Sequence, residues 1–319
     1  LDRRKYLKVI NNSFTSGNAK RLEDASGRYS EFLKSSLPRN ISKKKLKIVL
    51  DCANGATYNI APNLFWELGH KVISINNNPD GLNINKNCGA VDITHLSNKV
   101  LLEKADIGFA FDGDGDRLII VDEKGNEIDG DKILALFCKK FIKPRNKKNQ
   151  HDVIITVMSN MGLEKYLTEK LKLKIKRTSV GDINVINQMK KSKSLIGGEQ
   201  SGHIIISNYS NTGDGILAAL KVTEILVSSN DKPSKIFDLY KDFEQEKINI
   251  KFNNKNKKLI KILENIKKDK NFNNKYLRSI VRFSGTEPLI RILVEGEDKH
   301  KVKEKALIIK NRIEEYLGK

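Results

Sequence analysis

Residues 110–121 read AFDGDGDRLIIV and place the carboxylates of Asp112, Asp114 and Asp116 between two apolar runs. The run before the acids, ADIGFAFD from residue 105, and the run after them, LIIV, are both typical of buried strands. Glycines separate the acids and let the backbone curl between them. The stretch therefore predicts a strand, a tight acidic turn and a second strand, with three like charges held close together.

Strand patterns alternate with helical patterns around this stretch. Apolar strands at 46–56 and 71–76 precede it, and helical patterns at 61–70 and 94–104 lie between them. This alternation indicates a parallel or mixed α/β sheet. A second unit of similar size begins at residue 152 and ends in the long helix DGILAALKVTEILVSS, which we expect to pack on the sheet of that second unit.

The pattern changes near residue 246 to strand, helix, strand, strand, helix, which is typical of a small α+β domain with helices on an antiparallel sheet. A helical pattern at 19–36 stops before Pro38. The predicted fold class is thus α/β, with two α/β domains and a C-terminal α+β domain. The expected divisions are a helical segment at 1–38 and domains at 39–144, 145–245 and 246–319.

Composition narrows the classes of function. The 319 residues carry a net charge of +20, but the lysines are scattered through Asn-rich segments, so a nucleic-acid partner is disfavoured. There is no apolar run of the ~20 residues that a membrane span needs and no apolar signal core, so we expect a cytoplasmic protein without a membrane partner. The three cysteines are read as reduced thiols.

The acidic turn allows three interpretations. A calcium loop of the helix–loop–helix type is disfavoured, because Arg117 stands where the sharp turn needs glycine and strands flank the loop. An acidic surface turn without function is the second alternative. The favoured interpretation is a Mg²⁺ site, since hard carboxylate oxygens suit this ion and it would offset their repulsion. The guanidinium of Arg117 would then donate hydrogen bonds to a phosphate.

Two further loops offer complementary chemistry. GGEQSGH at 197–203 presents Glu199, Ser201 and His203, a set suited to sugar hydroxyls, although a polar surface turn would look similar. RFSGTEPLIR at 282–291 combines a turn rich in backbone N–H groups with flanking arginines, which suits a phosphate, although a solvated hairpin is the alternative. Its candidate ligands are Arg282, Ser284, Gly285, Thr286 and Arg291. Together the loops predict a cleft between domains for a metal, a sugar and a phosphate.

These three loops, in this order, resemble the metal-, sugar- and phosphate-binding loops of the α-D-phosphohexomutases. The segments LDCANGATYNIAP (50–62), ITVMSNMGLE (155–164) and GRYSEFLKS (27–35) are most similar to members that act on glucosamine phosphates. The resemblance extends from about residue 19 to the C-terminus. It implies interconversion of glucosamine 6-phosphate and glucosamine 1-phosphate through a 1,6-bisphosphate and a phosphoserine, for amino-sugar and peptidoglycan precursors.

The resemblance also implies residue roles. Mg²⁺ would bind Asp112, Asp114 and Asp116, and Arg117 would neutralise the transferring charge. Glu199 and Ser201 would hold sugar hydroxyls, with His203 as a candidate general acid or base. The third loop would anchor the phosphate that does not react. The implied partner is a hexosamine phosphate, with the 1,6-bisphosphate as activator; the sequence does not indicate an oligomeric state.

The sequence departs from the family pattern in two places. No serine loop of the form S/T-A-S-H-N-P occurs, so residues 1–38 are interpreted as the helical remnant of a first domain. Without the phosphoserine, this chain alone is expected not to convert substrate into product. Ile183 and Asn184 stand where Arg-Tyr is usual. Phosphomannomutase/phosphoglucomutase specificity and a non-catalytic sugar-phosphate-binding protein remain as alternatives.

Overall fold

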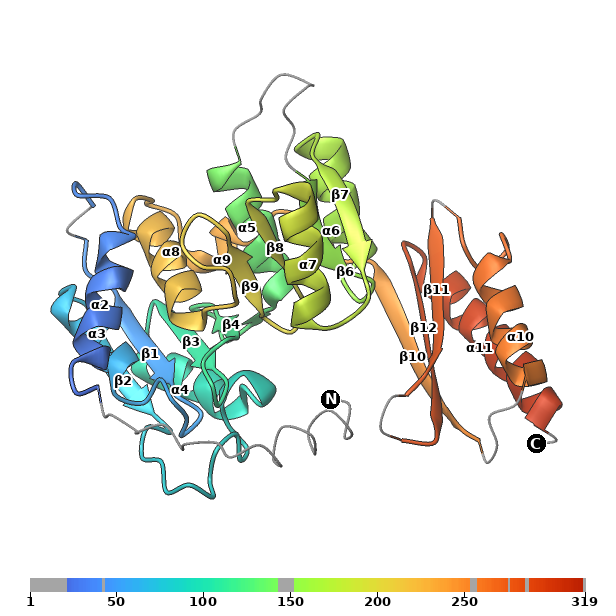
Figure 1. Ribbon diagram of the computed structural model, residues 1–319, viewed down its shortest axis with the longest axis horizontal. Coiled ribbons are helices and arrows are strands. Elements are labelled where there is room, and N and C mark those ends of the chain that lie inside the picture. The colour runs from blue at the N-terminus through green and yellow to red at the C-terminus, as the bar shows by residue number, and fades with distance from the viewer. Residues whose placement is uncertain are drawn as a thin grey trace, which may run out of the picture.

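The computed structural model describes residues 22–41, 44–142, 152–252, 257–274, 276–284 and 287–317. Figure 1 shows three sheets in a row, each with its own helices. The α/β prediction with a C-terminal α+β unit is confirmed. None of the helices in the described ranges has both the length and the apolar character that crossing a membrane requires.

The first sheet has the strand order β2-β1-β3-β4-β5. Strand β1 runs parallel to β2 and β3, whereas β4 pairs antiparallel with β3 and β5. Successive β1 residues pack on opposite faces: Ile48 belongs to the core shared with α2, α3 and α8, and Val49 packs with α4. The elements are α2 (Ala25–Ser35), β1 (Lys47–Asp51), α3 (Ile60–Glu67), β2 (Lys71–Ile75), η1 (Gly89–Val91), α4 (Thr94–Glu103), β3 (Ile107–Phe111), β4 (Leu118–Val121) and β5 (Glu127–Ile128).

The second sheet repeats this topology with the order β7-β6-β8-β9. Strand β6 is parallel to β7 and β8, and β9 turns back antiparallel to β8. The hairpin β8–β9 therefore occupies the same place in its sheet as β3–β4 does in the first. The elements are α5 (Gly130–Phe141), β6 (Asp152–Thr156), α6 (Met161–Lys165), η3 (Tyr166–Lys170), β7 (Lys174–Thr178), α7 (Asp182–Ser192), β8 (Ile196–Gly198), β9 (Ile204–Ile206), α8 (Gly215–Val227) and α9 (Pro233–Ile236).

Two helices cross between the α/β units. Helix α8 contacts β3 and β4 of the first sheet as well as β9, so the expectation that it packs on the second sheet was incomplete. Helix α5 contacts β8 of the second sheet, although the predicted division at residue 144 placed it with the first. Nearly all of α8 is buried, which is what a helix between two layers requires. The two units consequently share one continuous core.

The third sheet is antiparallel with the order β10-β12-β11. Its strands are β10 (Glu244–Lys251), β11 (Leu277–Phe283) and β12 (Leu289–Gly296). Helices α10 (Lys257–Lys268) and α11 (Lys299–Leu317) cover the face that points away from the other two sheets (Figure 1). The opposite face is turned toward the rest of the molecule, so polar side chains on it are available to a site between the units.

Hydrogen bonds and ion pairs join the second and third units. Arg278 on β11 donates from Nη2 to the Ser159 carbonyl at 2.8 Å, and Asn160 exchanges two bonds with the backbone of Phe243. Lys165 on α6 pairs with Glu297 just after β12, at 2.5 Å. These contacts hold the polar face of the third sheet against the second unit.

Asp131 at the start of α5 gives the fold a pH dependence. Its carboxylate is fully buried, and burial raises its pKa to about 7, with a smaller contribution from the charge of Asp129. A group whose pKa is higher in the folded than in the unfolded chain stabilises the fold in its protonated form. We therefore expect the contribution of Asp131 to fall as the pH rises from 4 to 7. Between pH 4 and pH 7, the Tm of Asp131→Asn should change less than the Tm of the parent chain. An equal dependence of Tm on pH in the two chains would contradict the assignment.

Candidate functional site

The acidic turn between β3 and β4 brings its three carboxylates together. One oxygen from each of Asp112, Asp114 and Asp116 lies within 4.8 Å of the others. Asp112 is buried at the base, whereas Asp114 is exposed at the tip. Asp112 accepts the backbone N–H of Arg117 at 3.1 Å, which closes the turn. Three hard oxygen donors on one side of a turn form a set that fits Mg²⁺.

The electrostatics of this turn are those of a cation site. The pKa of Asp112 is raised to about 6, chiefly by burial and to a smaller extent by the charges of Asp116 and Asp114, while the backbone N–H of Arg117 acts in the opposite direction. Arg117 Nε lies 3.4 Å from Asp112 Oδ2 and 3.7 Å from Asp116 Oδ1. One guanidinium among three carboxylates leaves the cluster negative, so a divalent cation would lower its energy.

The GGEQSGH loop meets the acidic turn directly. Arg117 and His203 form an antiparallel bridge, and Leu118 N donates to the Gly202 carbonyl at 3.0 Å. Gly202 has a φ of +95°, and a Cβ there would lie well inside van der Waals contact of the Leu118 carbonyl oxygen. Gly130 approaches the same loop, with its N–H bonded to the Gln200 carbonyl at 3.0 Å. Backbone hydrogen bonds thus join the β3–β4 hairpin of the first sheet to the equivalent β8–β9 hairpin of the second.

His203 lies beneath the acidic turn. Its ring is only 2% exposed, and Nε2 lies 3.3 Å from Asp116 Oδ2. His203 does not line the cavity described next. This position favours an interaction with the Asp116 carboxylate over a direct contact with substrate, and the role of general acid or base stays a prediction.

A cavity of about 570 Å³ opens beside the joined loops. Arg117 comes from the acidic turn, Glu199 and Ser201 come from the second loop, and Lys247 reaches it from β10. Glu199 accepts the N–H of Gly181 through Oε1 at 2.9 Å, which fixes its carboxylate. All three units therefore contribute residues to one cavity, although neither the three carboxylates of the acidic turn nor the arginines of the third loop belong to its lining.

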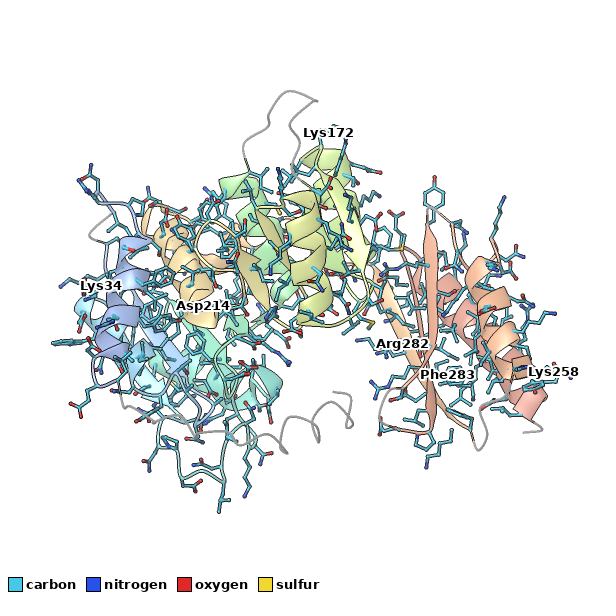
Figure 2. The ribbon with its side chains drawn as sticks, viewed as in Figure 1. Lys34, Lys172, Asp214, Lys258, Arg282 and Phe283 are labelled. Carbon is cyan, nitrogen blue, oxygen red and sulfur yellow. The ribbon has the colours of Figure 1, made fainter. Side chains whose placement is uncertain are left out.

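The two arginines that flank the third predicted loop lie on the same sheet face as Lys247 but outside the lining of this cavity. Arg282 on β11 is the register partner of Arg291 on β12. Leu293, two residues further along β12, is the register partner of Lys247, so these side chains lie on one face of the sheet. Arg282 and its neighbour Phe283 point to opposite faces, Phe283 toward the helices (Figure 2). Arg291 pairs with Glu287 at 2.7 Å, and Ser284 N bonds the Leu289 carbonyl. Gly285 and Thr286 lie outside the described residues.

Sequence reasoning missed several lining residues. Three lining residues belong to none of the predicted motifs: Lys247, Asp129 and Glu127. Gln200 lies within the GGEQSGH loop but was not itself predicted as a site residue. Asp129 is the N-cap of α5, accepting the Lys132 N–H at 3.1 Å, which is a signal that only marks a helix start. Lys247 looks like one more lysine in a basic chain. Their convergence depends on tertiary structure.

Comparison with known proteins places the chain in a family. Models of the phosphoglucomutase/phosphomannomutase family match it with alpha/beta/alpha domain II at residues 27–125, alpha/beta/alpha domain III at 129–243 and the C-terminal domain at 248–311. These matches cover most of the chain, and the fold agrees with them. The chain belongs to the phosphoglucomutase/phosphomannomutase family, that is, to the phosphohexomutases.

Relatives within the family carry a narrower name. A phosphoglucosamine mutase of Nautilia profundicola is 44% identical over 293 residues, covering 90% of this chain and 65% of the relative. A phosphoglucosamine mutase of Histophilus somni (strain 129Pt) is 47% identical over 286 residues, covering 88% and 63%. The chain thus spans slightly less than two thirds of the length of these relatives.

Solved structures share the fold at lower identity. A phosphoglucomutase/phosphomannomutase family protein of Burkholderia thailandensis aligns with a TM-score of 0.80 and 21% identity, over 97% of this chain and 68% of that one. An N-acetylphosphoglucosamine mutase of Aspergillus fumigatus, solved with GlcNAc-6P and magnesium, aligns with a TM-score of 0.65 and 20% identity, over 91% and 70%. At these identities the likeness supports the fold.

Proposed function

We propose that the chain carries the metal, sugar and phosphate sites of a phosphoglucosamine mutase, which interconverts glucosamine 6-phosphate and glucosamine 1-phosphate through a 1,6-bisphosphate. The observation that carries the proposal is the backbone junction of the acidic turn with the GGEQSGH loop beside a cavity that Lys247 also lines. The names of the relatives at 41–47% identity support glucosamine phosphates as substrates. A cytoplasmic location and the bisphosphate activator stay predictions.

Asp112, Asp114 and Asp116 would hold Mg²⁺, which fits their convergence and their hard oxygen donors. Bound there, the ion would polarise a phosphoryl oxygen and offset its negative charge. The protein's own contribution is to hold the carboxylates in place before binding: Arg117 N–H fixes Asp112, and His203 lies against Asp116. Arg117, which also lines the cavity, would stabilise the charge of the transferring phosphoryl group.

Glu199 and Ser201 would accept and donate hydrogen bonds to sugar hydroxyls from the wall of the cavity. Because the N–H of Gly181 occupies Glu199 Oε1, the other carboxylate oxygen is left for a ligand. The phosphate that does not react would bind Arg282, Ser284, Gly285, Thr286 and Arg291. Holding a distant phosphate orients the reacting end of the sugar, which is how remote binding energy can assist the transfer.

The anchoring role predicts a loss of ligand affinity in Arg282→Ala. We expect glucosamine 1-phosphate to bind about tenfold more weakly, because a charged hydrogen bond to phosphate contributes about 1.5–3 kcal/mol. Calorimetric titration of the full chain in Mg²⁺ measures this. The matched control is Arg312→Ala on α11, behind the same sheet, which should bind like the parent. Equal affinities for parent and Arg282→Ala would contradict the anchoring role.

A further inference from the structure

The cavity is lined by carboxylates that have no cation partner. Glu127, Asp129 and Glu199 line it, and none forms an ion pair within the described part of the chain. Of the nearby cations, Arg117 pairs with the acidic turn and Lys132 pairs with Asp242, at 3.0 Å, whereas Lys247 lines the cavity without an ion pair to these carboxylates in the described part of the chain. Carboxylates removed from water without a cation are costly unless a ligand supplies the charge.

Asp129 is the lining carboxylate that is best placed to meet such a ligand. Its Oδ1 accepts the backbone N–H of Lys132 at 3.1 Å, and its Oδ2 accepts Nε2 of Gln200 at 3.0 Å. Both donors are neutral, so they orient the carboxylate without cancelling its charge. Burial raises its pKa, the effect expected of a carboxylate that lacks a cation. Glu127, by contrast, is exposed.

The position of Asp129 is tied to the sugar loop. Gln200 stands between Glu199 and Ser201, and it contacts residues 129–130 through both its side chain and its backbone. Glu199 is about nine-tenths buried on the cavity wall, and only its Oε1 has a hydrogen-bond partner among the described residues. The second carboxylate oxygen of Glu199 is therefore open to a polar ligand in the cavity.

We propose that Asp129 recognises the ammonium group at carbon 2 of a hexosamine phosphate and so selects amino sugars over neutral sugars. The inference rests on the proposed function, because it assumes that Glu199 and Ser201 hold ring hydroxyls. With ring hydroxyls held by Glu199 and Ser201, a substituent at carbon 2 would lie near the loop to which Gln200 ties Asp129. An ammonium group would give Asp129 the cation partner that it lacks among the described residues.

The test compares two ligands on one variant. Asp129→Asn keeps an oxygen for the helix cap and removes the charge. We expect it to bind glucosamine 1-phosphate about tenfold more weakly, the loss typical of one charged hydrogen bond, and glucose 1-phosphate within about twofold of the parent chain. Calorimetric titration of the full chain in Mg²⁺ gives both affinities. Asp231→Asn is the matched control, because it removes an exposed carboxylate that pairs with Lys235 outside the lining, and both affinities should hold.

Each other outcome overturns the proposal. Equal losses for the two ligands would make Asp129 a structural support of the loop, and no loss for either would place the ammonium elsewhere. A parent chain that binds both sugars equally would show that it does not select amino sugars. If the parent binds neither ligand, the proposed function fails together with this inference, whereas sugar binding without discrimination would overturn the inference alone.

Discussion

Asp114→Asn is expected to lower the affinity of the chain for Mg²⁺ on the order of 100-fold, because an amide replaces one of three charged ligands. The fold should be kept, since Asp114 is exposed at the tip of the turn and its carboxylate makes no hydrogen bond with the described residues. Calorimetric titration with MgCl₂ near pH 8, where Asp112 is ionised, measures the change.

Asp114→Asn should also differ from the parent chain in thermal stability, because the three carboxylates of the turn repel one another. In Mg²⁺-free buffer, removing one of three crowded charges should leave the Tm unchanged or raise it. Asp231→Asn removes an exposed carboxylate that pairs with Lys235, and its Mg²⁺ affinity should equal that of the parent. Unchanged Mg²⁺ affinity in Asp114→Asn would show that the three carboxylates do not form the metal site.

Gly202→Ala is expected to destabilise the chain by about 3 kcal/mol or more, because the new Cβ would overlap the Leu118 carbonyl oxygen and the positive φ disfavours a side chain. Relief of the overlap would separate the second loop from β4 and break the bond from Leu118 N to the Gly202 carbonyl. The Tm should fall by several degrees, and sugar-phosphate binding should weaken with it. Thermal unfolding and ligand titration measure the two effects.

Gly27→Ala provides the matched control for this substitution. Gly27 lies in α2, and apart from its chain neighbours and the backbone of its own helix no atom lies within 4 Å of the position that its Cβ would take. Alanine is the better helix former, so the control should be neutral or more stable by about 0.5–1 kcal/mol. A Gly202→Ala chain as stable as this control would refute the tight junction between the two loops.

Local patterns predicted the elements of the site well. The acids of residues 112–116 lie between two strands as their apolar flanks indicated, and Glu199 and Ser201 follow a short strand at the second hairpin. The arginines at 282 and 291 are register partners on neighbouring strands. Helical periodicity could not show which sheet α5 and α8 would cover. An apolar helix face indicates that the face is buried, but it does not identify the element that packs against it.

The amino-acid sequence by itself determined the α/β class, the acidic turn and the two complementary loops, because each depends on short-range periodicity, glycine positions and side-chain chemistry. Tertiary structure alone decided that His203 is buried against Asp116, that Asp129 and Lys247 line the cavity, and that Arg282 lies outside its lining. The physical reason is that these contacts join residues far apart in the chain. Their positions follow from how two similar sheets pack on one core and from how the third sheet is held against them.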